Sequence, residues 1–305
     1  MDNLPKTVLT AALVRFFEAR ASAGEPMVLI TVLATRGSTY SKTGTQVLVD
    51  ATGRYEGLVS GGCLEQDLVD RSLQVIATGE PQSVEYDLFS DDEVFGLGIG
   101  CDGAMTLSLQ RLDAASAYEP FAGMLAALVD ARSTVVERSV PAGPVAARFR
   151  VHRPRRVLVL GAGKDVEPLA RLGNALGWQV TVADHRQGHV ERLQVPAACE
   201  ARCTPLDQAD ELVSAGQFDA VIVMSHQLTS DRRYLGVLAK ADVPFVGLLG
   251  PKTRRARLVA EIDADANAFE GRLRSPVGLK IGGQGPAAIA LEVVAELQQF
   301  FSQAL

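Results

Sequence analysis

The stretch Val157-Leu158-Val159-Leu160-Gly161-Ala162-Gly163 decides the fold of the second half of this 305-residue chain. Its apolar run predicts a buried strand, and the helical spacing that follows, through Leu176, predicts a helix. A second strand-like run from Gln179 ends at Asp184, 23 residues after Gly161. In a Rossmann βαβ unit such glycines let the backbone approach a pyrophosphate at a helix N-terminus, and such an acid binds a ribose diol. The sequence therefore predicts a Rossmann-like domain with a parallel sheet.

Two residues in this unit depart from the dinucleotide-binding pattern. Val166 stands in the place of the third glycine, and Pro168 falls in the first turns of the helix. Beyond them, strand-like and helix-like segments continue to alternate, at 219–224, 231–240, 243–248 and from about Pro286. We expect the α/β fold to form and the fit of a dinucleotide to be weakened.

In the first half, Gly61-Gly62-Cys63-Leu64-Glu65 places a thiol after a glycine pair, between a strand-like run at 54–60 and a helix-like run. Glycines without Cβ atoms let the backbone turn sharply and approach a ligand, and a cysteine near a helix N-terminus favours the thiolate. A second Gly-rich turn, residues 96–103, carries Cys101. The alternative is that both cysteines are small buried fillers, the common fate of a free cysteine.

The remaining pattern of the first half is that of an α/β domain. We expect a helix at 7–22, a polar loop from Arg36 to Gly44, and a hairpin whose connection is 51–53. The spacing of apolar residues also predicts strands at 27–34, 83–88 and 104–112, and helices at 64–76 and near 121–129. Pro141 to Pro144 and the basic cluster at 153–156 predict a seam between domains 1–150 and 151–305.

Composition and charge exclude several classes of protein. A net charge of -6 without any basic run argues against nucleic acid or an anionic membrane as a partner. The four cysteines form no disulfide framework, the N-terminus lacks the pattern of a signal peptide, and no apolar run approaches the length of about 20 residues that spans a bilayer. We therefore expect a cytoplasmic protein.

These motifs together resemble one family. The Gly-Cys turn at Cys63, the loop Arg36-Gly37-Ser38-Thr39, the second Gly-Cys turn and the C-terminal Rossmann unit resemble the XdhC/CoxI family, the accessory proteins of molybdenum hydroxylases such as xanthine dehydrogenase. Three further segments look like the family's C-terminal signatures: Ser225-His226, Gly247-Leu248-Leu249-Gly250 and Pro276-Val277-Gly278-Leu279-Lys280-Ile281-Gly282.

The resemblance implies a chaperone rather than an enzyme. Family members bind the molybdenum cofactor, as molybdopterin or its dinucleotide form, and protect it while a cysteine desulfurase installs its sulfido ligand. They then help to insert it into the apo-enzyme of a molybdenum hydroxylase. The expected partners are thus the hydroxylase and the desulfurase, with no nucleic acid and no membrane. A homo-oligomer is left open.

The candidate site residues follow from these motifs. In the first domain we assign cofactor binding to the phosphate-binding loop and the two turns, that is to Arg36, Ser38, Thr39, Gly61, Gly62, Cys63, Glu65, Gly100 and Cys101. Cys63 is the expected contact to the molybdenum centre. Glu65 either caps the following helix or accepts a proton from a neighbouring thiol. In the second domain a nucleotide or phosphate is assigned to Gly161, Gly163, Lys164, Asp184 and His226.

The second domain also departs from the family pattern. Lys164 stands where the family has a histidine after its glycines, Lys280 where it has an aspartate, and Arg274 or Ser275 in place of a further histidine. Two added lysines favour an anion over a metal, which needs histidine, cysteine or carboxylate ligands. Cys199 and Cys203 lack third and fourth partners, so we expect no closed zinc site.

Two other functions are compatible with parts of the pattern. An NAD-dependent oxidoreductase would account for the Rossmann opening and Asp184, with His226 as the acid-base candidate. A redox sensor would use a reversible disulfide between Cys63 and Cys101, for which the sequence gives no distance.

Overall fold

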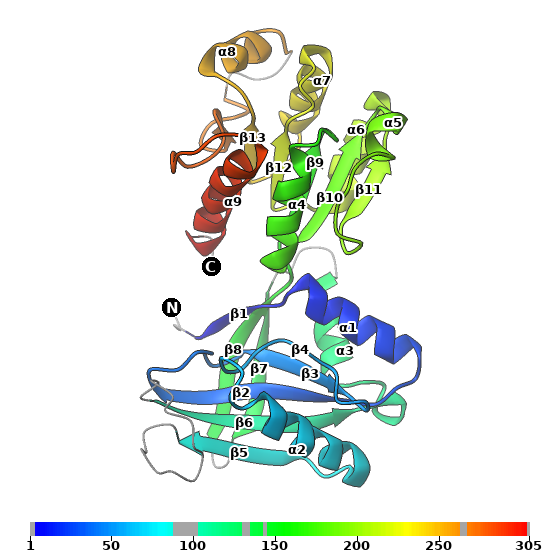
Figure 1. Cartoon of the computed structure of the whole chain (residues 1–305), viewed down its shortest axis with the longest axis vertical. Coiled ribbons are helices and arrows are strands. Elements are labelled where there is room, and N and C mark those ends of the chain that lie inside the picture. Colours follow the sequence, from blue (N-terminus) through cyan, green and yellow to red (C-terminus); the bar gives the residue numbers. More distant parts are fainter. Residues whose placement is uncertain (1–3, 88–102, 130–134, 143–144, 263–266, 304–305) are drawn as a thin grey trace. The chain divides into compact units, whose positions relative to one another are not determined.

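The structure is a computed structural model that describes residues 4–87, 103–129, 135–142, 145–262 and 267–303. The chain splits into two compact units, Met1–Arg153 and Pro154–Leu305 (Figure 1). Each unit has its own hydrophobic core.

A five-stranded antiparallel sheet forms the centre of the first unit (Figure 1). Its spatial order is β4-β3-β2-β6-β5, with bounds Tyr55–Glu56, Gln46–Asp50, Met27–Gly37, Gly103–Leu112 and Gln82–Asp87. Alternate residues of β2 enter different cores: Val28 and Ile30 pack with α2 (Glu65–Thr78), whereas Met27 and Leu29 pack with α1 (Ala11–Ser22) and α3 (Phe121–Val129). Both faces of the sheet are thus covered, which accounts for the continuous apolar run of β2.

A second sheet of this unit contains an element that the sequence did not predict. β1 (Lys6–Val8) pairs in parallel with β8 (Val145–His152), which pairs with β7 (Val135–Ala142). The helix predicted from residue 7 begins only at Ala11, because Thr10 caps it by accepting a hydrogen bond from the Leu13 N–H at 3.0 Å.

The segment predicted as part of a domain seam also belongs to this sheet. Pro141 pairs with Ala146 of β8, so this proline stands in a strand of the sheet. The compact units divide after Arg153, beyond the end of β8.

The second unit is a six-stranded parallel sheet in the order β11-β10-β9-β12-β13-β14 (Figure 1). The strands are Glu200–Cys203, Gln179–Asp184, Arg156–Leu160, Ala220–Val223, Phe245–Leu248 and Leu273–Arg274. The chain starts in the middle, runs outward to β11 and returns to β12, which is the Rossmann strand order. The predicted Rossmann-like domain with a parallel sheet is confirmed.

Helices cover both faces of this sheet. One core joins it to α4 (Val166–Ala175) and α9 (Pro286–Gln303), and the other joins it to α6 (Ala209–Gly216) and α7 (Leu228–Leu238). Two further helices are α5 (Gln187–Val190) and α8 (Lys252–Ala260). The strand order reverses between β9 and β12, so the crevice at their carboxyl ends is where this fold places a ligand.

Candidate functional site

The turn that carries Cys63 lies between β4 and α2. The strand predicted through Ser60 is wrong, because β4 ends at Glu56. Gly57 has a φ of +102°, and a Cβ there would lie 2.8 Å from the Gln46 carbonyl oxygen, so the chain leaves the sheet at this residue. Cys63 directly precedes Leu64, the N-cap of α2, and its thiol is free and half-buried.

Two buried side chains hold this turn from inside. The Ser60 hydroxyl oxygen accepts hydrogen bonds from the N–H groups of Gly62, Cys63 and Leu64, at 3.3, 3.1 and 3.1 Å. The Glu65 carboxylate accepts from the Ser60 N–H at 2.9 Å, from the Ser60 hydroxyl and from the Leu64 N–H at 3.1 Å. The position of Cys63 is therefore fixed by side chains of its own turn.

The Glu65 carboxylate is used in the hydrogen bonds that hold this turn. Burial by itself would raise the pKa of Glu65, but the hydrogen bonds from Ser60 and Leu64 outweigh it and leave the pKa below its usual value. An ionised acid with these donors stabilises the start of α2 and the turn before it, as the capping alternative for Glu65 requires.

The outer side of the turn is open. A Cβ at Gly61 or Gly62 would meet no atom within 4 Å, and Gly62 has a φ of +109°. Gly62 is thus required by backbone conformation, whereas the space beside Gly61 leaves room for a ligand to approach the main chain.

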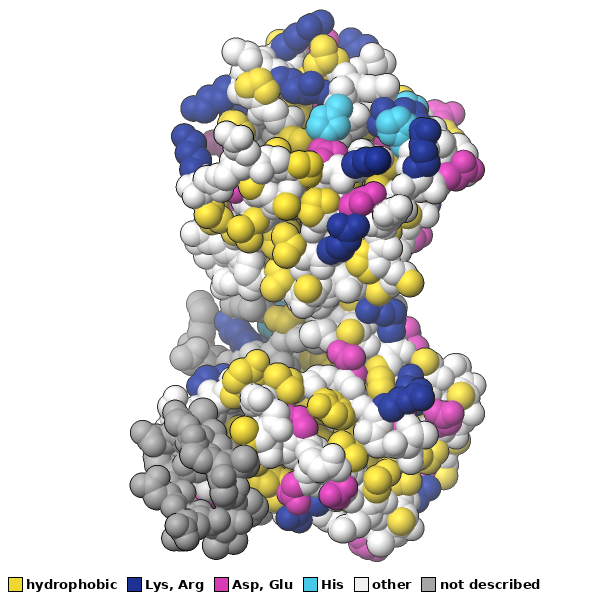
Figure 2. Space-filling model, in the orientation of Figure 1, with side chains coloured by type: hydrophobic (Ala, Val, Ile, Leu, Met, Phe, Trp, Pro, Cys, Tyr) yellow, Lys and Arg dark blue, Asp and Glu magenta, His cyan; other side chains and the backbone are white. Residues whose placement is uncertain are grey.

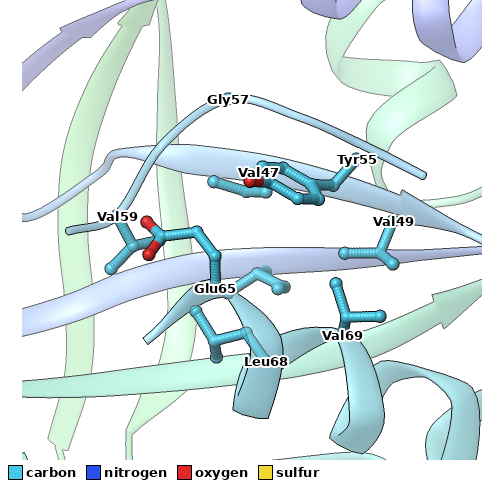
Figure 3. A pocket seen from close by; sticks show the side chains of 9 residues that line it. Val47, Val49, Tyr55, Gly57, Val59, Glu65, Leu68 and Val69 are labelled. Carbon is cyan, nitrogen blue, oxygen red and sulfur yellow. The ribbon is translucent and has the colours of Figure 1, made fainter. Parts of the chain in front are cut away.

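The cavity beneath the turn belongs to the core. It has a volume of about 10 Å³, room for about one water molecule, and Val47, Val49, Leu68 and Val69 are among the residues that line it. Figure 3 shows Glu65 at its edge, with the carboxylate turned toward Val59. A pterin does not fit there, so a large ligand at Cys63 would lie on the outer side of the turn.

The loop assigned to phosphate begins later than predicted. Arg36 and Gly37 belong to β2, because they pair with Ala104 and Gly103 of β6. The Arg36 guanidinium is exposed and lies 3.9 Å from the Asp87 carboxylate.

Within this loop the two hydroxyl side chains differ. Ser38 is exposed, but Thr39 is buried and donates its hydroxyl hydrogen to the Ser41 carbonyl oxygen at 2.8 Å. The Thr39 hydroxyl is therefore used inside the loop in this conformation, and its phosphate contact stays a prediction. Arg36 and Ser38 remain at the surface.

The structure brings the loop and the Cys63 turn together. The Ser41 hydroxyl donates to the Leu58 carbonyl oxygen at 3.0 Å, two residues before Ser60. A Cβ at Gly103 would overlap the Ser38 carbonyl oxygen, so the start of β6 packs against the same loop. Gly100 and Cys101, the candidates of the second turn, lie outside the described residues.

In the second unit, other atoms of the chain closely approach both glycines of the turn after β9, and Gly161 is required by its backbone conformation as well. Gly161 has a φ of +131°, and a Cβ there would lie 2.5 Å from the Met224 carbonyl oxygen. A Cβ at Gly163 would overlap the side chain of Asp165. The glycines therefore let the ends of β9 and β12 meet and let Asp165 fold over the turn.

The Asp184 carboxylate is likewise hydrogen-bonded within the chain. Its fully buried carboxylate accepts hydrogen bonds from the Ala162 N–H at 2.8 Å, from the Arg186 N–H at 2.9 Å and from the Arg186 guanidinium at 2.9 and 2.6 Å. Burial would raise the pKa of Asp184, but the bonds from Arg186 and Ala162 lower it overall. The carboxylate oxygens that a ribose diol would use are occupied by Arg186 in this conformation, and the contact to a ribose diol stays a prediction.

His226 and Lys164 lie in the loops that follow β12 and β9. The Nε2 atom of His226 is 2.7 Å from Oδ2 of Asp165, and His226 has a φ of +60°, which is uncommon outside glycine. Lys164 is exposed. Figure 2 shows histidines of this unit among lysine, arginine and acidic side chains.

Sequence reasoning missed Asp165, Arg186 and the buried network behind them. The Arg186 guanidinium also donates to the Ser225 carbonyl oxygen at 3.2 Å, while Ser225 donates its hydroxyl to Asp231, which pairs with Arg254 at 2.6 Å. An acid inside the glycine turn and an arginine two residues after Asp184 were the available signals.

The other two described cysteines lie in and before β11. The Cys203 thiol is exposed, 3.6 Å from the His185 carbonyl oxygen, and the Cys199 thiol is 3.7 Å from the Ala170 carbonyl oxygen. Within the described ranges, no group of three or more histidine, cysteine or acidic residues is placed to hold a metal ion. Over the same ranges no helix is long and apolar enough to cross a membrane.

Comparisons with known proteins agree over nearly the whole chain. Residues 20–87 match the model of the XdhC and CoxI family, and residues 157–297 match that of the XdhC Rossmann domain. A Bacillus subtilis protein described as a probable subunit of xanthine dehydrogenase is 30% identical, over 90% of this chain and 93% of its own length. The Escherichia coli molybdenum cofactor insertion chaperone PaoD is 26% identical, over 93% of this chain and 86% of its own.

A solved structure gives the same result. The crystal structure of a xanthine dehydrogenase (BH1974) from Bacillus halodurans is 26% identical, covers 96% of each chain and superposes with a TM-score of 0.75. The chain belongs to the XdhC and CoxI family.

Proposed function

We propose that this chain is a chaperone that binds the molybdenum cofactor and inserts it into a molybdenum hydroxylase of the xanthine dehydrogenase type. The observation that carries the proposal is the similarity, along nearly the full length, to a protein named a molybdenum cofactor insertion chaperone. The relative described as part of a xanthine dehydrogenase supports the class of the partner.

The residues present fit such a cofactor. When bound, it would supply a soft metal centre with sulfur ligands, a flat pterin and a phosphate. The Cys63 thiol is a soft ligand on a turn whose outer side is open, and the exposed Arg36 guanidinium is suited to a phosphate. In this proposal Cys63 contacts the metal end, and Arg36 with Ser38 holds the phosphate.

Protection and sulfuration are the finer part of the proposal. The bonds from Ser60 and Glu65 keep the Cys63 backbone fixed while the thiol stays half-buried, which limits its access to oxidants in bulk solvent. A cysteine desulfurase is the partner that would bring sulfur to the cofactor while this chain shields it.

The second unit has a supporting role in the proposal. Lys164, next to the turn after β9, would hold a phosphate or nucleotide in a separate site of this unit. Hydride transfer with NAD is disfavoured, since Asp184 is bound to Arg186 and Asp165 adds a negative charge at the turn.

Elemental analysis tests the proposal directly. The wild-type chain, purified from a host that makes the cofactor, should contain molybdenum, and Cys63→Ala should lose most of it. Cys199→Ala is the matched control, because Cys199 is also half-buried. Equal retention by the two variants would remove Cys63 from the site, and absence of molybdenum in the wild type would reject the function.

A further inference from the structure

Tyr40 is the most exposed large apolar side chain among the described residues, at 63%. The residues on either side of it are buried, Thr39 at 8% and Ser41 at 6%. A ring that projects between two buried neighbours is presented by the fold, because an unattached loop would expose all three residues alike. No hydrogen bond or ring contact within the described part of the chain engages this tyrosine.

The backbone that carries Tyr40 is fixed on both sides. The Thr39 hydroxyl donates to the Ser41 carbonyl oxygen at 2.8 Å, and Lys42 Nζ donates back to the Thr39 carbonyl oxygen at 3.2 Å. The Gly44 N–H donates to the Val32 carbonyl oxygen at 2.8 Å and ties the end of the loop to β2. The backbone of this loop would therefore lose little conformational freedom on binding a ligand.

The same bonds place Tyr40 next to the Cys63 turn. The Ser41 hydroxyl donates to the Leu58 carbonyl oxygen at 3.0 Å, and Leu58 is itself 38% exposed. From Leu58 the chain runs through buried Val59 to Ser60, which accepts the Cys63 N–H. One hydrogen bond and a short stretch of chain thus join the loop that carries Tyr40 to the turn that carries Cys63.

The surroundings select a small flat ligand over a protein surface. Tyr40 lies in its loop between exposed polar residues, Ser38 and Lys42, so its ring is the apolar surface of this loop, with Leu58 on the neighbouring segment. A stable protein interface buries about 800 Å² on each partner, far more than these two side chains offer. A single heterocycle stacks on one ring, and such stacking tolerates many ring structures.

We propose that Tyr40 is the stacking platform for the pterin ring of the cofactor, with Leu58 at its edge. This inference rests on the proposed function and adds a second point of attachment. Cys63 holds the metal end of the ligand, and Tyr40 holds the face of its ring.

Binding of the cofactor by three variants tests this. The dissociation constant for molybdenum cofactor should rise about fivefold or more in Tyr40→Ala and stay within about twofold of wild type in Tyr40→Phe. Tyr55→Ala is the matched control, a tyrosine of the same unit that is 44% exposed. Quenching of pterin fluorescence on binding should be lost only in Tyr40→Ala, and thermal unfolding should verify that all variants are folded.

The possible outcomes distinguish the stacking role of Tyr40 from the chaperone function. If the wild type binds cofactor and Tyr40→Ala binds it equally well, the stacking role is overturned and the chaperone function stands. Unchanged cofactor affinity with weaker binding of the hydroxylase apo-enzyme would assign Tyr40 to protein docking and also overturn the inference. A wild type that binds no cofactor overturns the proposed function itself.

Discussion

The Nε2 atom of His226, in the loop after β12, lies 2.7 Å from Oδ2 of Asp165, in the turn before α4. This contact spans the point where the strand order reverses and where a Rossmann fold binds a dinucleotide. It places a carboxylate over the glycine turn, and a side chain at Gly163 would overlap it. In this conformation the space beside Gly163 is thus occupied by a side chain of the same turn.

Asp165→Ala should improve binding of anions to the second unit. Removing a negative charge at the turn leaves Lys164 and the backbone N–H groups without a competing carboxylate, so the dissociation constant for CTP should fall by about threefold or more. Calorimetry on the full chain measures it, with Asp207→Ala, a change at an exposed acid elsewhere in the unit, as the control. Wild-type chain should bind NAD weakly and form no NADH. An unchanged dissociation constant for CTP would mean that the Asp165 carboxylate does not compete with anions at this turn.

Arg36→Ala should weaken cofactor binding without unfolding the protein. A hydrogen bond to a charged group contributes about 1.5 to 3 kcal/mol, so the dissociation constant should rise by about tenfold or more. Asp87→Asn should have the opposite effect, by up to about fivefold, because Asp87 competes with a phosphate for the Arg36 guanidinium. Arg54→Ala, at an exposed arginine in the same unit, should leave the dissociation constant for the cofactor unchanged. If Arg36→Ala binds as tightly as wild type, the phosphate lies elsewhere.

The stability of the first unit should depend on pH through Glu65. Since the pKa of Glu65 is lower in the folded chain, its carboxylate stabilises the fold above the ordinary glutamate pKa of about 4.3, and this contribution disappears as the pH falls through the folded value. Glu65→Gln should therefore lower the free energy of unfolding at pH 7, by about 1 to 3 kcal/mol, and differ less from wild type near pH 3.

Urea unfolding at the two pH values measures this difference. Glu18→Gln, at an exposed glutamate of α1, serves as the control and should match wild type at both. A deficit of Glu65→Gln that is equally large at both pH values would show that the charge of Glu65 is not what stabilises the turn.

The sequence by itself determined the elements whose signals are local. The apolar run, glycine turn and helix of the second unit were enough to predict the Rossmann fold, since period and turn residues act over a few positions. For the same reason the end of α2 before Gly79, with its φ of +79°, and the start of α9 at Pro286 could be predicted. The Gly-Cys turn was recognised in this way from Gly61 to Glu65, but Ser60, which holds the turn, was assigned to a strand.

Only the tertiary structure decided which partner each group has. Lys6 to Val8 become a strand because β8, far along the chain, offers a free edge, and no local pattern encodes that pairing. Asp184 has the spacing of a ribose-binding acid, yet Arg186 and the Ala162 N–H fill its lone pairs. A hydrogen bond depends on which donors the fold brings within about 3 Å, and a buried charge must find such donors inside the protein. The spacing along the chain therefore identified Asp184 as an acid at the end of a strand, whereas the fold determined which donors it binds.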